Sequence, residues 1–317
     1  MSGGVLTIGE GLGVLRTRGF GSLAHEPDLV VGTGGAEGNV AIGLARLGTP
    51  VTWLGRVGDD GLGTRVVREL RAEGVAVVAP VDPAAATGLL IKESPSPGRT
   101  VVTYHRAGSA GSRLSPSDLE PVDLEGFDLL HVTGITPALS ASARAAIDAA
   151  VDGARAAGVR VSFDVNHRRS LWPDAAAAAE CYRSLASRAD LVFAGDEEAA
   201  LVTGLADAAP AALARAIAGL GPTEVVVKLG DRGALALGDG AVAERPAVPV
   251  GVVDTVGAGD AFVAGYLAAR LAGEPVAARL DLAVRTGAAA CTHPGDWEGF
   301  PTRRDLDRRP GQDPVAR

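Results

Sequence analysis

The sequence is poor in cysteine and lysine and has no long hydrophobic run. Among its 317 residues the only cysteines are Cys181 and Cys291, which excludes a disulfide framework and favours a reducing cytoplasm. No run of about 18 apolar residues occurs, so no membrane-spanning helix is expected. The start, Met1 to Gly4, lacks the basic and apolar regions of a signal peptide. The only lysines are Lys92 and Lys228, a bias that we attribute to genome composition.

Positive charge is also in the minority. Acidic residues outnumber lysine and arginine by 38 to 30, giving a formal net charge of −8. This balance argues against nucleic acid or an anionic membrane surface as the main partner. Two nucleotide-binding motifs are missing as well. There is no G-x-x-x-x-G-K-[ST] loop and no G-x-G-x-x-G between a first strand and a helix, which disfavours P-loop and nicotinamide-binding Rossmann enzymes.

What the sequence does contain is an alternation of short β-rich runs with helical patterns. Hydrophobic residues make up 47% of the chain, enough for one large domain or two smaller ones. Alternation of this kind predicts parallel βαβ units with helices on both faces of a sheet and ligands at the carboxyl ends of its strands. Strands are expected at 5–9, 51–54, 129–133, 160–164, 191–194 and 225–229, and helices at 39–47, 62–73, 140–157, 208–220 and 261–271.

Two segments interrupt the alternation. Residues 10–31 are Gly-rich without helical periodicity, and 88–106 reads as two extended runs around a proline-containing turn. Together they predict a small β-element that projects from the main sheet; a plain surface hairpin is the alternative. The main α/β domain is then expected at 1–9, 32–87 and 107–306. The tail 307–317 carries prolines and mixed charge and is expected to fray.

The segment D-T-V-G-A-G-D at 254–260 carries the strongest chemical signal. It lies where a loop becomes an apolar helix, so free backbone N–H groups and the positive end of the helix dipole favour a phosphate there. The N–H groups of Gly257, Ala258 and Gly259 suit an anion hole. Asp260 suits a catalytic base that accepts the proton of an attacking hydroxyl. An ordinary glycine turn is the alternative.

A second motif, G-G-A-E-G-N at 34–39, opens another amphipathic helix. In order and separation, the two motifs resemble the signatures of the PfkB (ribokinase-like) carbohydrate kinases, and the resemblance extends from about residue 5 to 306. It implies an α/β fold, a three-layer αβα sandwich with a mostly parallel central sheet and a small β lid. It also implies ATP and Mg²⁺, K⁺ as an optional ion, a homo-oligomer (dimer or higher) formed through the lid, and sugar contacts from Gly34, Gly35 and Asn39.

The same resemblance assigns further residues to the nucleotide and the ions. Lys228, Gly230 and Gly233 belong to a turn on the nucleotide side, where the glycines allow close backbone approach. Glu198 matches the acid of an N-x-x-E motif that acts on the Mg²⁺–phosphate network, although Gly195 stands in place of the asparagine. By the same resemblance, the backbone of Asp254 helps to hold a monovalent cation that shapes the loop; a turn-stabilising Asx contact is the alternative.

Substrate class is suggested by three segments that resemble 2-keto-3-deoxygluconate kinases within this family. They contribute Tyr104, Arg106, Arg168 and Asp296. Arginine recognises carboxylates in a planar, bidentate manner, so Arg106 and Arg168 are candidate clamps for a sugar acid, with Tyr104 donating a hydroxyl.

Two positions depart from that pattern, because Leu90 replaces a frequent tyrosine and His105 stands at a second aromatic position. We therefore expect transfer of the γ-phosphoryl group of ATP to the primary hydroxyl of a sugar acid, with 2-keto-3-deoxygluconate giving its 6-phosphate. A fructokinase or ribokinase acting on a neutral sugar is the alternative. A catalytically silent sugar-binding relative is a third hypothesis, against which the presence of Asp260 argues.

Overall fold

The computed structural model describes residues 3–96, 99–238 and 240–307. Its centre is a nine-stranded sheet in which all neighbouring strands are parallel except at one edge, where β14 and β15 are antiparallel. The order across the sheet is β15 (Ala241–Arg245), β14 (Ala234–Gly238), β13 (Glu224–Lys228), β12 (Leu191–Gly195), β11 (Arg160–Asp164), β10 (Leu129–Thr133), β1 (Val5–Ile8), β4 (Val51–Leu54) and β6 (Ala76–Val78).

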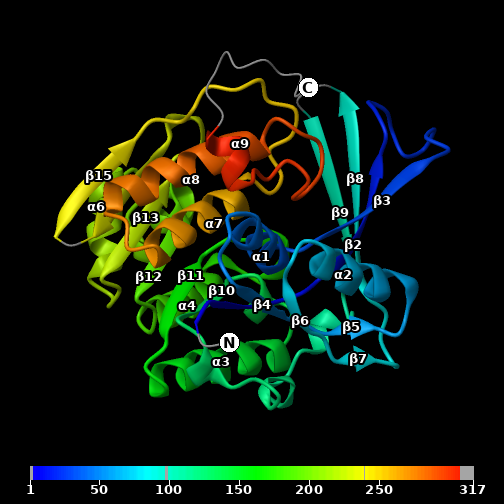
Figure 1. Cartoon of the computed structure of the whole chain (residues 1–317), viewed down its shortest axis with the longest axis horizontal. Coiled ribbons are helices and arrows are strands. Elements are labelled where there is room, and N and C mark those ends of the chain that lie inside the picture. The colour runs from blue at the N-terminus through cyan, green and yellow to red at the C-terminus, as the bar shows by residue number, and fades with distance from the viewer. Residues whose placement is uncertain (1–2, 97–98, 239, 308–317) are drawn as a thin grey trace.

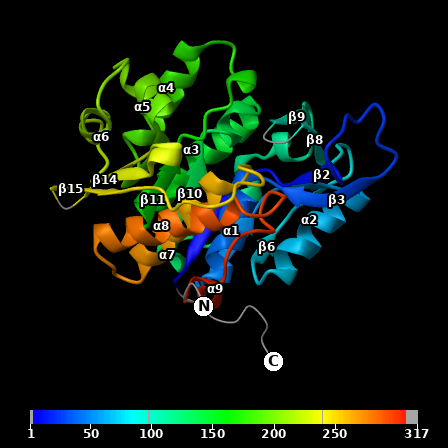
Figure 2. The ribbon, with the colours of Figure 1, turned by 90° about the horizontal axis from the view of Figure 1, so that it is seen from above.

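Helices cover both faces of this sheet, which confirms the predicted three-layer α/β fold (Figures 1 and 2). One face carries α1 (Ala36–Arg46), α2 (Gly61–Ala72), α7 (Ala258–Leu271) and α8 (Val276–Ala290). The other carries α3 (Ala141–Ala156), α4 (Ala175–Ala186), α5 (Asp196–Thr203) and α6 (Pro210–Ala218). A short α9 (Arg303–Asp307) follows, and six 3₁₀ turns lie at Gly111–Arg113, Pro116–Leu119, Leu124–Gly126, Thr136–Ala138, Arg169–Leu171 and Gly230–Arg232.

The core consists of two apolar layers, one on each side of the sheet. Small residues let the helices lie close to the strands: in α3 the buried positions include Ala143, Ala146, Ala150 and Ala154, spaced by three or four residues along one face. The six strands and five helices expected from the sequence are all present, with ends shifted by three residues or fewer. Helix α8 and the antiparallel pair β14 and β15 were not predicted.

A second sheet of four strands stands beside the main one, in the order β3 (Leu29–Gly34), β2 (Leu12–Thr17), β8 (Gly88–Ser96) and β9 (Arg99–His105). Leu12, Val14 and Leu90 form its small apolar core. Strand β3 continues past residue 31, where the projecting element was expected to end. The predicted turn at 94–98 lies partly outside the described residues, as does all but the first residue of the expected tail. A two-stranded pair, β5 (Val57–Gly58) and β7 (Val81–Asp82), completes the structure.

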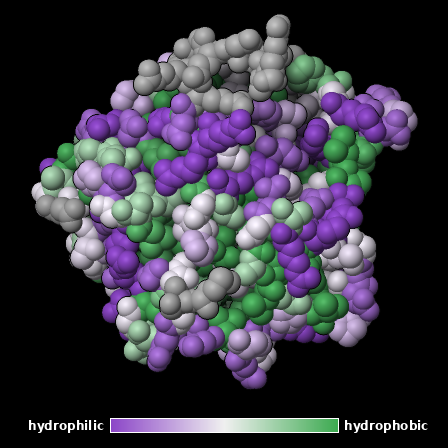
Figure 3. All heavy atoms as spheres, in the orientation of Figure 1, coloured by the Kyte–Doolittle hydropathy of each residue, from purple (hydrophilic) through white to green (hydrophobic). Residues whose placement is uncertain are grey.

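The surface in the view of Figure 3 is mostly polar, with apolar residues in separate smaller patches. Within the described part of the chain, no helix is both long enough and apolar enough to cross a membrane.

Candidate active site

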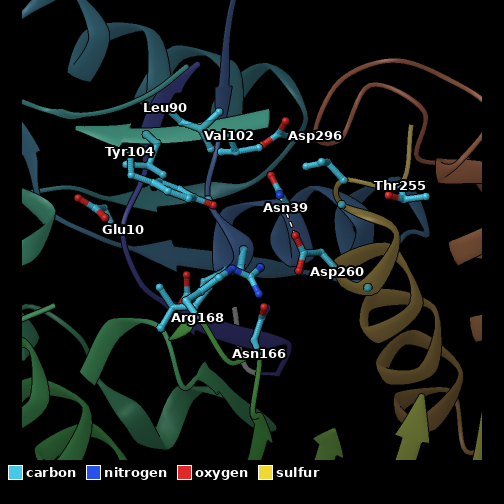
Figure 4. A pocket seen from close by; sticks show the side chains of 18 of the residues that line it. Glu10, Asn39, Leu90, Val102, Tyr104, Asn166, Arg168, Thr255, Asp260 and Asp296 are labelled. Carbon is cyan, nitrogen blue, oxygen red and sulfur yellow. Dashed lines mark hydrogen bonds between the residues drawn. The ribbon is translucent and has the colours of Figure 1, made fainter. Parts of the chain in front are cut away.

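Asp260 lies in the first turn of α7, three residues after the N-cap residue Gly257 and at the point where the two sequence motifs meet. The side-chain amide of Asn39, in α1, donates a hydrogen bond of 2.8 Å to Asp260 Oδ2 (Figure 4). Burial raises the pKa of Asp260 to about 7, while the Asn39 hydrogen bond and the positive charge of Arg168 act in the opposite direction. A carboxyl with this pKa is suited to accept and release a proton near neutral pH.

The start of α7 also offers unused hydrogen-bond donors. Gly257 adopts φ = 79°, and the N–H groups of Gly259 and Asp260 donate to no other group in the described part of the chain. A Cβ atom at Gly257 would lie 1.8 Å from the carbonyl oxygen of Asp296, so only glycine fits there. At Gly259 the nearest atom to such a Cβ would be Lys228 Nζ, at 4.0 Å. Gly257 is therefore required by the protein itself, whereas Gly259 faces open space.

Two cavities meet at this helix start. The first, about 440 Å³, extends toward the four-stranded sheet and is lined largely by polar and charged side chains. The second, about 570 Å³, is lined mainly by apolar residues, including Val248, Val250 and Phe262. Lys228, Thr255 and Gly259 line both. A molecule in one cavity can therefore meet a molecule in the other at the N-terminus of α7.

The first cavity contains most of the predicted sugar-binding residues. Its walls include Gly35, Asn39, Leu90, Tyr104, Arg106, Arg168, Asp260 and Asp296, and Figure 4 shows many of these side chains around a shared space. Gly34 does not line this cavity, although a Cβ there would lie 2.5 Å from Asp296 Oδ2, a residue that does. His105 is exposed and is not part of this lining. Its departure from the family pattern therefore does not alter the cavity wall directly.

Arg106 and Arg168 differ in their surroundings. The buried Arg106 stacks over Tyr104 and donates from Nε to Glu10 Oε2 at 2.7 Å, with a second, shorter contact from Nη2. The other oxygen of Glu10 accepts a hydrogen bond from Ser109. Arg168 donates to the carbonyl oxygen of His167 and, among the described residues, forms no salt bridge. Arg106 thus has its charge compensated by Glu10, and Arg168 is the better placed of the two to receive an anionic ligand.

Asp296 is a buried carboxyl with spare hydrogen-bonding capacity. Burial raises its pKa to about 6, against the opposing charge of Lys92. In the described part of the chain its Oδ1 has no hydrogen-bond partner, and it lies 3.5 Å from Lys92 Nζ. An unsatisfied acceptor in a cavity wall is suited to a ligand hydroxyl.

The predicted nucleotide-side residues Lys228, Gly230 and Gly233 all line the second cavity, and each is held there by different contacts within the protein. Lys228 Nζ is bound to both carboxylate oxygens of Asp164, at 2.7 and 2.9 Å. Gly230 and Gly233 both line the cavity. A Cβ at Gly233 would lie 2.0 Å from the carbonyl oxygen of Arg245, so contact with β15 already requires a glycine at that position.

The two predicted ion-binding acids are held by protein donors. Glu198 accepts hydrogen bonds from the backbone N–H groups of His167 (2.7 Å) and Gly195 (2.6 Å), and it lines the first cavity. Within the described residues, no three side chains of His, Cys, Asp or Glu gather as a metal site. This arrangement fits Mg²⁺ bound chiefly through nucleotide phosphates, as is usual for that ion. Asp254 forms the Asx contact with Val256 N–H at 3.2 Å and also binds Lys92.

Several residues of the site were not identified from the sequence. Glu10 and Lys92 lie in the walls of the first cavity, and Asp164 binds Lys228. Asn166, another wall residue, adopts a positive φ of 41° at the end of β11. One signal was available. Both lysines of the chain line this site. Because we attributed the scarcity of lysine to genome composition, we did not ask why these two positions keep it.

Comparison with known proteins agrees with this geometry. The model of the pfkB family carbohydrate kinases matches residues 12–303. The 2-dehydro-3-deoxygluconokinase of Bacillus subtilis (strain 168) is 37% identical over 310 residues, covering 95% of this chain and 93% of the relative. A fructokinase of Klebsiella pneumoniae is also 37% identical, over 316 residues, with coverages of 97% and 99%.

Solved structures show the same fold. A PfkB protein from Polaromonas sp. JS666 has a TM-score of 0.87 at 36% identity, covering 96% of this chain and 99% of that one. A ribokinase II described as putative, from E. coli and in complex with ATP and Mg²⁺, has a TM-score of 0.88 at 26% identity, with coverages of 96% and 98%. A fructokinase variant from Vibrio cholerae O395 in a fructose-, ADP- and potassium-bound form has a TM-score of 0.85 at 29% identity, with coverages of 96% and 97%. The chain belongs to the PfkB family and is a carbohydrate kinase.

Proposed function

We propose that this kinase uses ATP to phosphorylate the primary hydroxyl of a sugar acid, with 2-keto-3-deoxygluconate as the substrate and its 6-phosphate as the product. The observation that carries the proposal is Arg168, a guanidinium without a salt bridge among the described residues, in a cavity that also contains the candidate base Asp260. A carboxylate can use this charge, whereas a neutral sugar cannot. The 2-dehydro-3-deoxygluconokinase relative supports the same substrate class.

In this proposal the two cavities hold the two substrates. The apolar second cavity receives the nucleotide base, and the triphosphate reaches the N-terminus of α7, where Gly257, Ala258 and Gly259 form the anion hole. Lys228 and the backbone at Gly230 and Gly233 line the phosphate path. Bound Mg²⁺, near Glu198, would neutralise charge on the transferred phosphoryl group.

At the sugar end, Asp260 accepts the proton of the attacking hydroxyl, and Asn39 holds its carboxylate in place. Asp296 offers its unsatisfied oxygen to a sugar hydroxyl. Tyr104 and the backbone at Gly35 complete the wall of this cavity, and Gly34 lies next to Asp296 outside the lining. Arg106, fixed by Glu10, still has a further amino group to donate, so it supports the carboxylate more weakly than Arg168 does.

A neutral hexose or pentose is the second candidate, because one observation favours it. The Glu10–Arg106 pair cancels one of the two expected clamp charges, and Leu90 provides no hydroxyl. The fructokinase relative is as similar in identity as the sugar-acid kinase. The choice between the two classes therefore depends on Arg168.

The test is a coupled ADP-release assay with 2-keto-3-deoxygluconate, fructose and ribose. The wild type should prefer the sugar acid by kcat/KM. Arg168→Met should raise KM for the sugar acid by about one to two decades, since a charge-assisted pair contributes roughly 1.5–3 kcal/mol. It should change activity on a neutral sugar little. Arg169→Met, which alters an exposed neighbouring arginine, is the matched control.

Two outcomes of that assay would count against the proposal. A wild type that prefers fructose or ribose would replace the sugar acid with a neutral substrate. A kcat loss of equal size on acid and neutral sugars in Arg168→Met would assign Arg168 to the transferred phosphoryl group instead.

We also propose that the four-stranded sheet is the lid, with segments 10–31 and 88–106 as its main parts, and that it joins two copies of the chain. Leu15 lies beside Val31 and Ile91 in register, on the face opposite the buried Val14 and Leu90. Val31 is 41% exposed in the single chain. A partly exposed apolar sheet face of this kind supports a homodimer. Use of ATP and the two unpaired cysteines support a cytoplasmic location.

A further inference from the structure

The two lysines of the chain occupy equivalent electrostatic situations. Each lines the first cavity and each is paired with a buried aspartate: Lys228 with Asp164, and Lys92 with Asp254. Everywhere else this chain uses arginine as its cation. A compact ammonium group on a flexible stem can enter a space that a planar guanidinium cannot. Lys92 is the one whose role the proposed reaction does not explain.

Lys92 connects three separate segments. It projects from β8 of the lid sheet and is only 3% exposed. Its ammonium forms an ion pair with Asp254 and lies 3.5 Å from Asp296 Oδ1. Asp254 begins the loop that ends in the anion hole. Asp296 belongs to the loop after α8, and its carbonyl oxygen lies directly against Gly257.

The charge of Lys92 is needed because the two aspartates are close together and buried. Asp254 and Asp296 are 8% and 5% exposed. Burial raises the pKa of Asp296, and the negative charges of Glu298 and Asp254 add to this effect. Two carboxylates removed from water and placed near each other require a cation between them. In the described structure Lys92 is that cation.

A monovalent metal ion at the Asp254 carboxylate does not fit this arrangement. Its Oδ1 accepts from Val256 N–H, and its Oδ2 accepts from Gly295 N–H (3.3 Å) and contacts Lys92 Nζ. K⁺ placed on the same carboxylate would meet the ammonium group. The family resemblance implies that the backbone of Asp254 helps to hold a monovalent cation. Its carboxylate is occupied by these donors and cannot also contribute to such a site, whereas a related fructokinase has been solved with bound potassium.

We propose that Lys92 replaces the monovalent cation of this loop: the lid supplies an ammonium group that neutralises Asp254 and Asp296 and so fixes the anion-hole loop. The kinase should then work without K⁺, and its phosphate-binding loop should be ordered only while the lid strand β8 is in place. The proposal rests on the proposed kinase chemistry for its activity readout alone; its stability readout needs no substrate.

The test compares wild type with Lys92→Met in KCl and in tetramethylammonium chloride at equal ionic strength. Methionine keeps the apolar stem and removes the charge. The wild type should have the same Tm and the same kcat/KM, within about twofold, in both salts. Lys92→Met should lose Tm and at least about tenfold in kcat/KM in tetramethylammonium, and KCl should raise its Tm in a concentration-dependent manner, as for any ligand of the native state. Arg16→Met removes a charge from the position beside Lys92 in β2 and should show no response to K⁺.

A second variant covers the case in which the Met site is too small or too apolar for K⁺. In Lys92→Met/Asp254→Asn the uncompensated carboxylate is gone, so at least half of the lost Tm should return without K⁺. Three results would overturn the proposal. The first is a wild type that loses tenfold or more in kcat/KM, or several degrees in Tm, when K⁺ is absent. The second is a Lys92→Met protein with the same Tm and kcat/KM as wild type in tetramethylammonium. The third is a loss of Tm in Lys92→Met that neither KCl nor the additional Asp254→Asn substitution restores. Inactivity of every protein on every sugar, with the Tm pattern intact, would instead refute the proposed substrates.

Discussion

Asp260→Asn should abolish most of the activity and at the same time stabilise the fold. Loss of the base should lower kcat by at least ~10²-fold, the usual contribution of general-base catalysis. The gain in stability follows from the pKa of Asp260, which burial raises from 3.8 to about 7. Between these two values the folded protein keeps a proton that the unfolded chain releases, so the free energy of unfolding falls as pH rises through this window.

The size of the effect can be bounded. A rise in pKa from 3.8 to about 7 corresponds to at most on the order of 4 kcal/mol of folding free energy at pH 8. Asparagine has the same size and can still accept the Asn39 hydrogen bond through its carbonyl oxygen. Part of the cost remains because the amide is also polar and buried, so we expect Asp260→Asn to be more stable than wild type by roughly 1–3 kcal/mol at pH 8. Near pH 4 the difference should almost vanish.

The measurements are urea unfolding at pH 4.5 and pH 8, and coupled ADP release at pH 8. Asp281→Asn, on the exposed side of α8, is a control for loss of one carboxylate and should change neither stability nor turnover noticeably. Near wild-type turnover in Asp260→Asn would refute the assignment of the base. A variant less stable than wild type at pH 8 would refute the reasoning from burial.

Two further predictions concern the anion hole and the buried carboxylate of Glu224 in β13. Gly259→Ala should keep the wild-type Tm but lower kcat/KM for ATP by at least about tenfold. Apart from its own helix turn, the only atom of the described residues within 4.0 Å of the new Cβ is Lys228 Nζ, yet the Cβ projects where phosphate is expected. Gly257→Ala should instead lower Tm by several degrees, since its Cβ would lie 1.8 Å from the carbonyl oxygen of Asp296. A loss of Tm in Gly259→Ala together with an unchanged Tm in Gly257→Ala would contradict these assignments. Burial alone would raise the pKa of Glu224, but hydrogen bonds from Tyr266, Arg270 and Arg279 lower it below its ordinary value of 4.5. The ionised carboxylate therefore stabilises the fold above pH 4.5, and this contribution is lost as the pH falls through the lowered pKa. Glu224→Gln should cost about 3 kcal/mol in urea unfolding at pH 7 and lose that difference in acid, whereas an equal cost at both pH values would contradict the electrostatic explanation.

Much of the fold was predictable because its signals are local. The strands at 129–133 and 160–164 are short apolar runs between helical patterns, and they occur with those bounds. The approach of Asn39 to Asp260 was implied by the family resemblance, which assigns both residues to the sugar site. The rule for loops after parallel strands does not account for it, because α1 follows β3 of the four-stranded sheet and α7 follows the antiparallel β15. Helix α8 was missed although its alanine-rich sequence is helical in character.

What could not be predicted depends on pairings across long stretches of sequence. Arg106 was expected to be a free carboxylate clamp, but Glu10, 96 residues away, compensates its charge. Lys92 reaches Asp254 only because the four-stranded sheet, which carries Lys92 on β8, comes into contact with the loop before α7. Arg106 was predicted from its own segment, and Lys92 was not identified as a site residue at all. Whether the charge of a basic residue is available to a ligand is decided by a partner that only the tertiary structure brings within reach.

An internal competition experiment tests the central claim most directly. The wild-type enzyme is given MgATP and an equimolar mixture of 2-keto-3-deoxygluconate and fructose, and the early products are quantified by NMR, so that their ratio reports the ratio of the two kcat/KM values. We predict that the 6-phosphate of 2-keto-3-deoxygluconate exceeds fructose phosphate by at least about tenfold, the discrimination expected from one charge-assisted pair at Arg168. A mixture dominated by fructose phosphate, or a sugar acid phosphorylated at any position other than its primary hydroxyl, would contradict the account.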